Sequence, residues 1–190
     1  MAYTSVRELL NACKSEGARL DEVILRSDLG ESGLTEEESR AQMRRLWQVM
    51  VETSRNYRAE DRSTSGFAGG DAAKVEKAAA SGLLYSGGYY AQVIAEALKT
   101  AECNACMKRI VAAPTAGSCG VLPAVLIPLW REGLCDEDAI CRALYVAAGF
   151  GQVVAARATL AGAVGGCQAE VGAASAMAAA ALVYLKGNRT

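Results

Sequence analysis

The chain has 190 residues, 52% of them hydrophobic, and is therefore long enough to bury one sizeable core. Lys and Arg number 20 against 21 Asp and Glu, and the resulting net charge of -1 argues against a partner that is nucleic acid or an anionic membrane. We therefore expect a small molecule or another protein as the partner. The charged start of the chain lacks the apolar core of a signal peptide, which predicts a cytoplasmic protein.

The chain contains seven cysteines and no histidine. Without a signal peptide, reduced thiols or metal ligands are expected in place of a disulfide framework. The absence of histidine removes the commonest general acid or base and the commonest protein metal ligand. Proton transfer must therefore use Lys, Asp, Glu, Tyr or Cys, a cofactor, or a partner chain.

The first third of the chain predicts three helices. A Ser-x-x-Glu capping box and apolar residues at helical spacing predict a helix over 6–16, and a short helix is expected over 20–26. A loop over 29–35 ends in Thr35, which forms a second capping box with Glu38 and opens a long amphipathic helix. The arginines of that helix are expected on its solvated side.

A long polar loop rich in glycine follows over 61–71. Asp71 is expected to cap a helix that begins at Ala72. Backbone N–H groups at such a helix start can bind an anion, and Lys74, one turn further on, could add a positive charge. A plain connector is the alternative, and from the pattern alone it is the more frequent case.

A helix is expected over 89–110, and it contains Cys103 and Cys106. A C-x-x-C pair indicates zinc or redox chemistry only beside a second pair or in a βα unit, and neither is present. We therefore interpret these two cysteines as core thiols.

A second loop of small residues, 113–120, opens a helix with Pro123 near its first turn. Its hydroxyls and glycine N–H groups suit a carboxylate. A further helix, capped by Asp136, is expected to continue toward residue 157.

One thiol stands between two glycines and a long Ala-rich helix, in the stretch Gly165-Gly166-Cys167-Gln168-Ala169-Glu170-Val171-Gly172. Unpaired N–H groups and the positive end of the helix dipole favour a thiolate at such a position, and the thiolate is the form that ligates metals. A small buried cysteine at a tight helix entry is the structural alternative.

The fold class that these patterns predict is all-α. No strict repeat and no sustained period-2 pattern of a strand is present. We expect one helical domain over 1–190, a compact bundle of Ala- and Gly-rich helices whose glycine-rich loops at helix N-termini form the site.

A family resemblance rests on three stretches. They are Ser65-Gly66-Phe67-Ala68-Gly69-Gly70-Asp71-Ala72-Ala73-Lys74, Ala112-Ala113-Pro114-Thr115-Ala116-Gly117-Ser118-Cys119-Gly120-Val121-Leu122-Pro123, and the Gly165 to Gly172 stretch. Together they closely resemble the α chain of bacterial iron–sulfur-dependent L-serine dehydratase (L-serine ammonia-lyase). The resemblance implies a lyase of amino-acid degradation and gluconeogenesis that converts L-serine to pyruvate and ammonia. Its cofactor is a 4Fe–4S cluster with one iron open for substrate, and it uses no pyridoxal phosphate.

The resemblance also implies roles for single residues. Cys167 is implied as a ligand of the cluster, whose open iron acts as a Lewis acid on serine. The general base is unassigned: Lys74 is one candidate, and in two-chain members histidines near the site lie on a separate β chain. The implied substrate-facing residues are Ser65, Gly66, Thr115, Gly117 and Ser118.

The chain departs from the family pattern in three places. It stops at Thr190, before two further cluster cysteines, so we expect an incomplete C-terminus and a 190-residue chain that is inactive alone. Arg157 and Ala161 replace polar residues of relatives, which leaves the choice among serine, threonine and cysteine open. Ala116 stands where single-chain relatives carry Asn. We expect the active form to be a homo- or hetero-oligomer that includes the β chain.

Other readings remain open. A related iron–sulfur lyase could act on L-cysteine or L-threonine, and a cluster-free helical scaffold would use its thiols only as core. Zinc is disfavoured because the one cysteine pair lacks partners. The glycines over 69–70 match neither nucleotide-binding motif.

Overall fold

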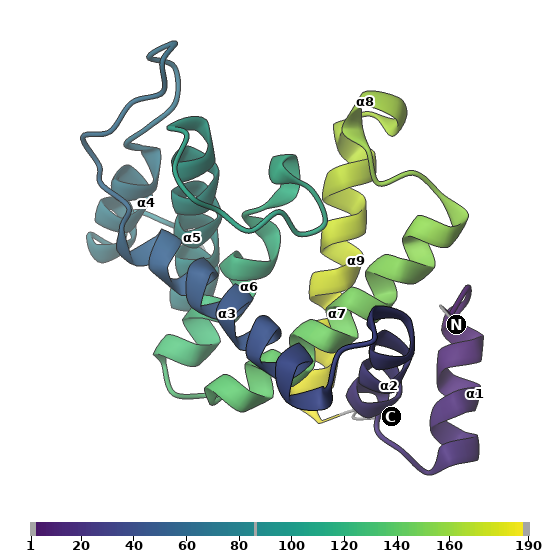
Figure 1. Ribbon diagram of the computed structural model, residues 1–190. Helices are drawn as coiled ribbons and strands as arrows, with labels where there is room; N and C mark the ends of the chain where they lie inside the picture. Colours follow the sequence, from purple (N-terminus) through teal and green to yellow (C-terminus); the bar gives the residue numbers. More distant parts are fainter. Residues whose placement is uncertain (1–2, 86, 188–190) are drawn as a thin grey trace. The chain divides into compact units, whose positions relative to one another are not determined.

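The computed structural model describes residues 3–85 and 87–187, and every regular element within these ranges is helical (Figure 1). The all-α prediction is therefore confirmed. The chain divides into two compact units, which are called unit 1 (Met1–Trp47 and Cys135–Thr190) and unit 2 (Gln48–Leu134). The helices are α1 (Val6–Glu16), α2 (Leu20–Ser32), α3 (Glu36–Arg55), α4 (Asp71–Ala80), α5 (Gly88–Ala105), the 3₁₀ turn η1 (Ala116–Ser118), α6 (Val121–Arg131), α7 (Glu137–Arg157), α8 (Gly162–Gly165) and α9 (Cys167–Lys186).

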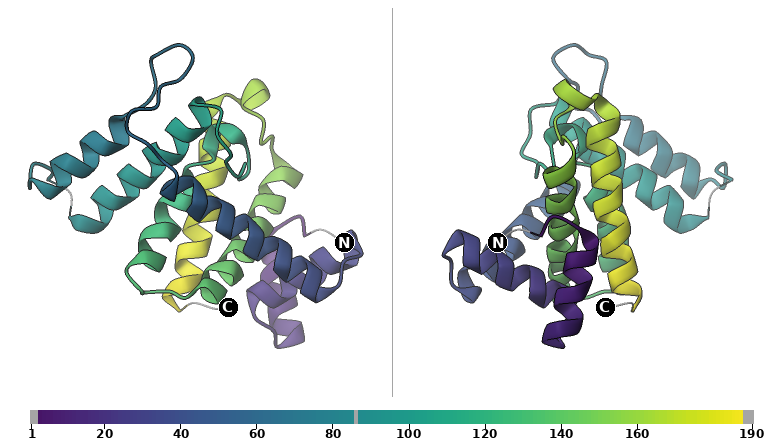
Figure 2. Two further views of the ribbon diagram at one scale, coloured as in Figure 1. Left: turned by 60° about the vertical axis from the view of Figure 1, so that its left-hand side comes forward. Right: turned by 90° about the vertical axis from the view of Figure 1, so that its right-hand side faces the viewer.

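Unit 1 is built around α7 and α9, which lie side by side in both views of Figure 2 and make the most extensive contact of the chain. Small residues permit this close approach: Ala143, Ala147, Ala174 and Ala181 are all at most 1% exposed. Helix α2 packs on α7, and α1 packs on α2. The first residue of α9 is thus carried by the most extensively packed pair of helices in the unit.

In unit 2, α5 packs against α4 on one side and against α6 on the other. Where α6 begins, a Cβ on Gly120 would come within 2.7 Å of the Ala97 carbonyl oxygen, so a residue without a side chain is needed there. The carboxylate of Glu96, 1% exposed, accepts hydrogen bonds from Ser54 (2.5 Å), Arg131 (2.7 Å) and Lys99 (3.1 Å). These bonds satisfy a buried charge that would otherwise be costly.

The predicted helix starts agree with the structure at three positions. The Ser5 hydroxyl accepts from the Glu8 N–H (3.2 Å), and the Asp136 carboxylate accepts from the Ala139 N–H (2.7 Å). The second capping box is complete, because Thr35 accepts from the Glu38 N–H (3.3 Å) and the Glu38 carboxylate accepts from the Thr35 N–H (2.9 Å). Local sequence signals were sufficient at these caps.

Two helix boundaries differ from the prediction. Helix α2 continues to Ser32, six residues past the expected end, because Gly30 is accommodated inside it and Gly33 (φ 69°) ends it. Helix α5 stops at Ala105, five residues short of the expected end. Cys106 is therefore the C-cap and not an interior residue, and Met107 takes the left-handed conformation (φ 59°).

Helices α7 and α9 are both long and apolar enough, by length and composition, to cross a membrane. Core helices of water-soluble proteins meet the same criterion. Half of the α7 residues and a third of the α9 residues in the most apolar stretch are buried within the protein, and the two helices pack on each other. Length and composition alone thus do not assign either helix to a membrane.

Candidate functional site

Cys167 is the first residue of α9, as predicted. Gly166 precedes it with φ 78° and ψ 169°, a backbone conformation that residues with a Cβ rarely adopt, and it serves as the N-cap without a side-chain hydrogen bond. The Gly166 carbonyl accepts from the Ala169 N–H (3.0 Å) and starts the helix. The thiol therefore lies at a helix N-terminus, where the helix dipole favours an anion.

Exposure distinguishes Cys167 from the other six cysteines, all of which lie in the described part of the chain. Cys167 is exposed, and the remaining thiols are buried or half-buried. Burial raises the pKa of the thiols of Cys103, Cys119 and Cys135, and it raises that of Cys141 to about 11. The alternative of Cys167 as a small buried core residue is therefore wrong.

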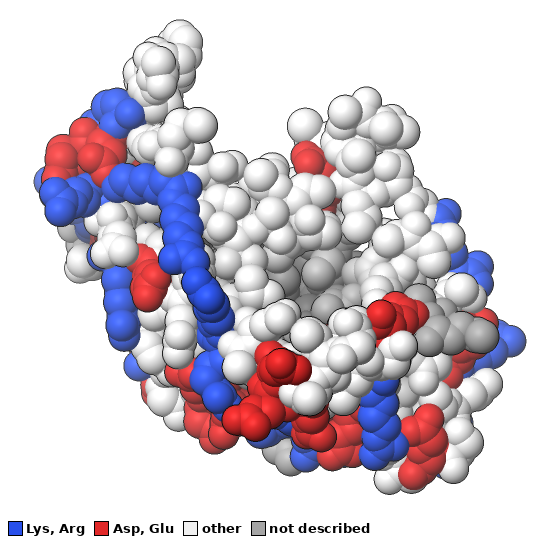
Figure 3. Space-filling model, in the orientation of Figure 1, with Lys and Arg blue, Asp and Glu red and all other residues white. Residues whose placement is uncertain are grey.

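The surroundings of Cys167 carry almost no charge. Figure 3 shows the α8 end of unit 1 as mostly uncharged surface with one acidic group, and between residues 158 and 185 Glu170 is the single charged residue. Its carboxylate lies against Gly162, where an added Cβ would come within 2.5 Å of Oε2. Within residues 3–85 and 87–187 no group of three or more His, Cys, Asp or Glu side chains is arranged to hold a metal ion. Cys167 therefore fits as one ligand of a cluster, and the described residues do not complete the set.

The loop predicted to face a substrate, with Thr115, Gly117 and Ser118, forms η1 in unit 2. The Thr115 and Ser118 hydroxyls lie 3.1 Å apart and are hydrogen-bonded to each other. Ser118 is 2% exposed, whereas Thr115 is half-buried and Gly117 is exposed. The Asn104 side-chain amide donates to the Ala116 carbonyl (3.0 Å) and fixes the turn to the end of α5. Thr115 and Gly117 are the two of these residues that solvent can reach.

Ser65 and Gly66 lie in an exposed turn of the same unit. The Ser63 and Ser65 hydroxyls are 3.1 Å apart, and the Gly66 N–H donates to the Ser63 carbonyl (2.8 Å). Phe67 at the tip is 94% exposed. The turn is thus held by its own hydrogen bonds and presents small polar groups and one aromatic ring to solvent.

The predicted anion position at the start of α4 is already filled by the protein's own carboxylate. Glu102 on α5, 6% exposed, accepts from the N–H groups of Gly70 (2.7 Å), Asp71 (2.8 Å) and Ala72 (3.0 Å). Helix α4 begins at Asp71 with Gly70 as its N-cap, so the prediction that Asp71 caps it was wrong. The charge of Glu102 satisfies the same orphan donors that a bound anion would use.

Lys74, the candidate base, is exposed and pairs with Asp71 at 2.7 Å. This ion pair lowers the pKa of the Asp71 carboxyl. The lysine thus lies on the solvated side of α4. Arg157, at the end of α7, donates to the Thr4 carbonyl oxygen (2.6 Å).

The predicted site residues fall into two groups. Ser65, Gly66, Lys74 and the η1 residues belong to unit 2, and Cys167 belongs to unit 1. Within unit 2 the structure brings Thr115 and Ser118 together. Sequence reasoning missed Glu102, because its partners lie about 30 residues away and no local pattern marks the pairing.

A comparison with protein families adds the deciding observation: the model of the serine dehydratase alpha chain matches residues 6–190. The chain belongs to this family. The match covers both motif loops and the stretch around Cys167, so it agrees with the resemblance read from the sequence.

Relatives across the family support this assignment. The chain is 39% identical over 184 residues to the L-serine dehydratase alpha chain of Peptoniphilus asaccharolyticus, covering 96% of this chain and 63% of the relative. It is 36% identical over 185 residues to the probable L-serine dehydratase alpha chain of Bacillus subtilis, covering 97% and 62%. The L-serine dehydratase of Mycobacterium tuberculosis is 35% identical over 208 residues, covering 98% and 42%. The chain thus spans less than two thirds of these relatives. No solved structure matches it.

Proposed function

We propose that this chain is the alpha component of an enzyme that deaminates L-serine to pyruvate and ammonia. The observation that carries the proposal is the exposed Cys167 thiol at the N-terminus of α9, inside a chain that the serine dehydratase alpha chain family matches over residues 6–190. The names of the relatives from Peptoniphilus asaccharolyticus and Bacillus subtilis support serine as the substrate.

In this proposal Cys167 supplies one thiolate ligand to a 4Fe–4S cluster. Helix N–H groups and the dipole of α9 stabilise the anionic sulfur. A bound cluster with an open iron supplies Lewis-acid chemistry, which favours departure of the serine hydroxyl. The further cysteine ligands come from chain beyond Thr190, because the described residues offer one exposed thiol.

The loops of unit 2 orient the amino acid in this proposal. Thr115 presents a hydroxyl, and Gly117 presents exposed backbone, both suited to the carboxylate of serine. Ser118 is buried against Thr115 and holds that hydroxyl in position. Small uncharged groups of the Ser65 turn border the same ligand without adding charge. Binding by these residues orients the substrate so that its α-proton faces a base.

The base that removes the α-proton comes from a partner β chain. The alpha chain itself contains no histidine, and its Lys74 forms an ion pair with Asp71 in solvent. The alpha chain alone is therefore inactive, and the two chains together are active. The word alpha in the names of the relatives supports a multi-chain enzyme.

The test is an anaerobic activity assay of the encoded protein, purified alone and with its β chain. We expect pyruvate and ammonia from L-serine only with both chains, and no activity in Cys167→Ala. The matched control is Cys106→Ala, which removes a half-buried thiol and should stay active. Equal turnover by the alpha chain alone would refute the need for a partner.

Substrate choice is tested in the same assay. Arg157, where relatives carry a polar uncharged residue, is the reason to test the alternative of L-threonine or L-cysteine. If ammonia is released faster from L-threonine or L-cysteine than from L-serine, that amino acid is the substrate in place of serine. No iron uptake by the assembled enzyme would favour the scaffold alternative instead.

A further inference from the structure

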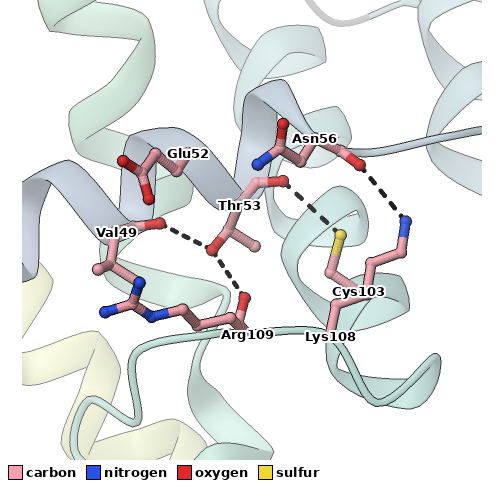
Figure 4. A pocket seen from close by; sticks show the side chains of 7 residues that line it. All are labelled: Val49, Glu52, Thr53, Asn56, Cys103, Lys108 and Arg109. Atoms are coloured by element: carbon pink, nitrogen blue, oxygen red, sulfur yellow. Dashed lines mark hydrogen bonds between the residues drawn. The ribbon is translucent and has the colours of Figure 1, made fainter.

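Unit 2 contains a cavity of about 290 Å³ between the second half of α3 and the segment that follows α5 (Figure 4). The residues that α3 contributes repeat at i, i+3, i+4 and i+7, and therefore lie on one face of the helix. They are Val49, Glu52, Thr53 and Asn56, the last just beyond the helix end. Cys103, Lys108 and Arg109 complete the lining.

Several polar groups of the cavity hold its two walls together. The Thr53 hydroxyl lies 2.8 Å from the Val49 carbonyl oxygen and 3.0 Å from that of Arg109. The Cys103 thiol donates to the Thr53 carbonyl (3.7 Å). The Lys108 ammonium donates to the Asn56 carbonyl (3.3 Å) and also forms an ion pair with Asp61. These contacts, drawn in part as dashed lines in Figure 4, fix the backbone around the cavity.

Three side chains of the lining have no such partner. Within the described residues, no hydrogen bond or ion pair engages the Glu52 carboxylate, the Arg109 guanidinium or the Asn56 side-chain amide. Figure 4 shows Glu52 and Asn56 rising from α3, and Arg109 extending along the segment beneath the helix. One acid, one base and one amide thus line the same cavity without neutralising one another.

We propose that this cavity binds a small zwitterionic α-amino acid. A guanidinium recognises a carboxylate through two parallel hydrogen bonds, so Arg109 takes the ligand carboxylate. Glu52 takes the α-ammonium group. The Asn56 amide can donate to or accept from a short polar side chain. At about 30 Å³ per water, the cavity has room for about ten waters, which is ample for a small amino acid.

Position gives this site a link to the Thr115 loop. Arg109 lies on the segment between the end of α5 and η1, whose backbone the Thr53 hydroxyl fixes to α3. A ligand that joins Arg109 to Glu52 adds a second tie between α3 and this segment, six residues before Thr115. The site uses neither Cys167 nor Thr115, and the inference does not depend on serine deamination.

The test is a titration of the ¹⁵N-labelled encoded protein with L-serine, followed by amide NMR shifts. Glu52 and Arg109 are exposed at the rim, so we expect weak binding, with a Kd on the order of millimolar. The amides of Thr53, Asn56 and Arg109 should shift in a saturable way. Glycerate lacks the ammonium group and ethanolamine lacks the carboxylate, so each should bind at least about tenfold more weakly.

Charge-removing variants assign each contact. Arg109→Gln and Glu52→Gln should each weaken serine binding about tenfold, equivalent to about 1.4 kcal/mol. Glu52→Gln should also reduce the preference for serine over glycerate, because the ammonium has lost its partner. The matched controls are Arg45→Gln and Glu60→Gln, exposed charges outside the cavity, and they should bind serine as the wild type does.

Three results would overturn the proposal: no saturable shift with L-serine, unchanged affinity in both cavity variants, or glycerate binding as tightly as serine. A further variant separates this site from the proposed function. Cys167→Ala should keep the shifts at Asn56 and Arg109. If Cys167→Ala loses serine binding and Arg109→Gln retains it, serine binds at the proposed cluster site. That result would refute a site in this cavity and would leave the proposed function unaffected.

Discussion

Removal of the Glu102 carboxylate is the most informative structural perturbation of unit 2. Two of the three N–H groups that it accepts from are in buried contacts, and the third contact is half-buried. These N–H groups are the orphan donors of the first turn of α4. Burial and a hydrogen bond with Glu102 also raise the pKa of the Tyr57 hydroxyl to about 12, so the carboxylate is a shared acceptor.

The cost follows from counting donors. At about 1 kcal/mol for each net hydrogen bond, Glu102→Ala should lower the free energy of unfolding by roughly 3 kcal/mol. Glu102→Gln keeps one acceptor oxygen, which can retain the bonds from Asp71 and Ala72 while the Gly70 N–H loses its partner. This variant should cost about 1–2 kcal/mol, similar to the loss of an N-cap. A larger loss of stability in Glu102→Ala than in Glu102→Gln is what a capping acceptor predicts.

Thermal unfolding followed by circular dichroism measures this cost. For a chain of this length, each kcal/mol corresponds to roughly 2–4 °C in Tm, so Glu102→Ala should lose roughly 6–12 °C. Hydrogen exchange should accelerate at the Gly70, Asp71 and Ala72 amides. Glu60→Ala, which removes an exposed carboxylate, is the control. If Glu102→Ala has the same Tm as Glu60→Ala and the three amides stay protected from exchange, Glu102 does not cap α4.

Three further predictions concern thiols, helix packing and acid stability. Iodoacetamide at pH 8 should label the exposed Cys167 first and Cys141 last, because Cys141 is buried and its pKa is raised to about 11. Peptide mass spectrometry measures the two labelling rates, and equal rates would contradict the burial pattern. Gly120→Ala should lower the free energy of unfolding by about 1–3 kcal/mol because the added Cβ overpacks the start of α6. Gly172→Ala has open space around the added Cβ and should stabilise α9 by about 0.5–1 kcal/mol. Urea titration measures both variants, and a Gly120→Ala variant as stable as the wild type would argue against the close contact. Burial raises the pKa of Glu96, but hydrogen bonds from its neighbours outweigh burial and leave that pKa below 4.5. The stability that this carboxylate contributes is therefore present above pH 4.5 and is lost as the pH falls through the lowered pKa. The free energy of unfolding, measured from pH 7 to 3, should fall less steeply in Glu96→Gln than in the wild type, and an unchanged slope would contradict this.

The helix caps of the fold were predictable because their signals are local. Ser5, Thr35 and Asp136 each bond an N–H three residues away. The end of α5 was not predictable from apolar periodicity, which continues to Ile110. The chain leaves the helix at Cys106, where the Lys108 N–H donates to the Cys103 carbonyl (2.9 Å) and Met107 takes a positive φ.

Long-range contacts limited the prediction of the candidate site. The helix start at Cys167 follows from two glycines and an alanine run, and the structure has it at that residue. By contrast, the α4 start looked open to an anion, because nothing near residue 71 reveals that Glu102 fills it. The roles of Ser65, Gly66, Thr115, Gly117, Ser118 and Lys74 toward a substrate stay predictions.

The iron and acid-labile sulfide content of the encoded protein shows directly whether Cys167 holds a cluster. The protein is purified anaerobically with the proposed β chain as wild type, Cys167→Ala and Cys106→Ala, and iron, acid-labile sulfide and the iron–sulfur absorption band are measured together. We expect iron, sulfide and the band in the wild type and in Cys106→Ala. Cys167→Ala should lose all three and still unfold in one cooperative thermal transition, with its Tm lowered by the loss of the bound cluster. A band that persists in Cys167→Ala, or a wild-type protein without iron, would contradict the assignment of Cys167 as a cluster ligand.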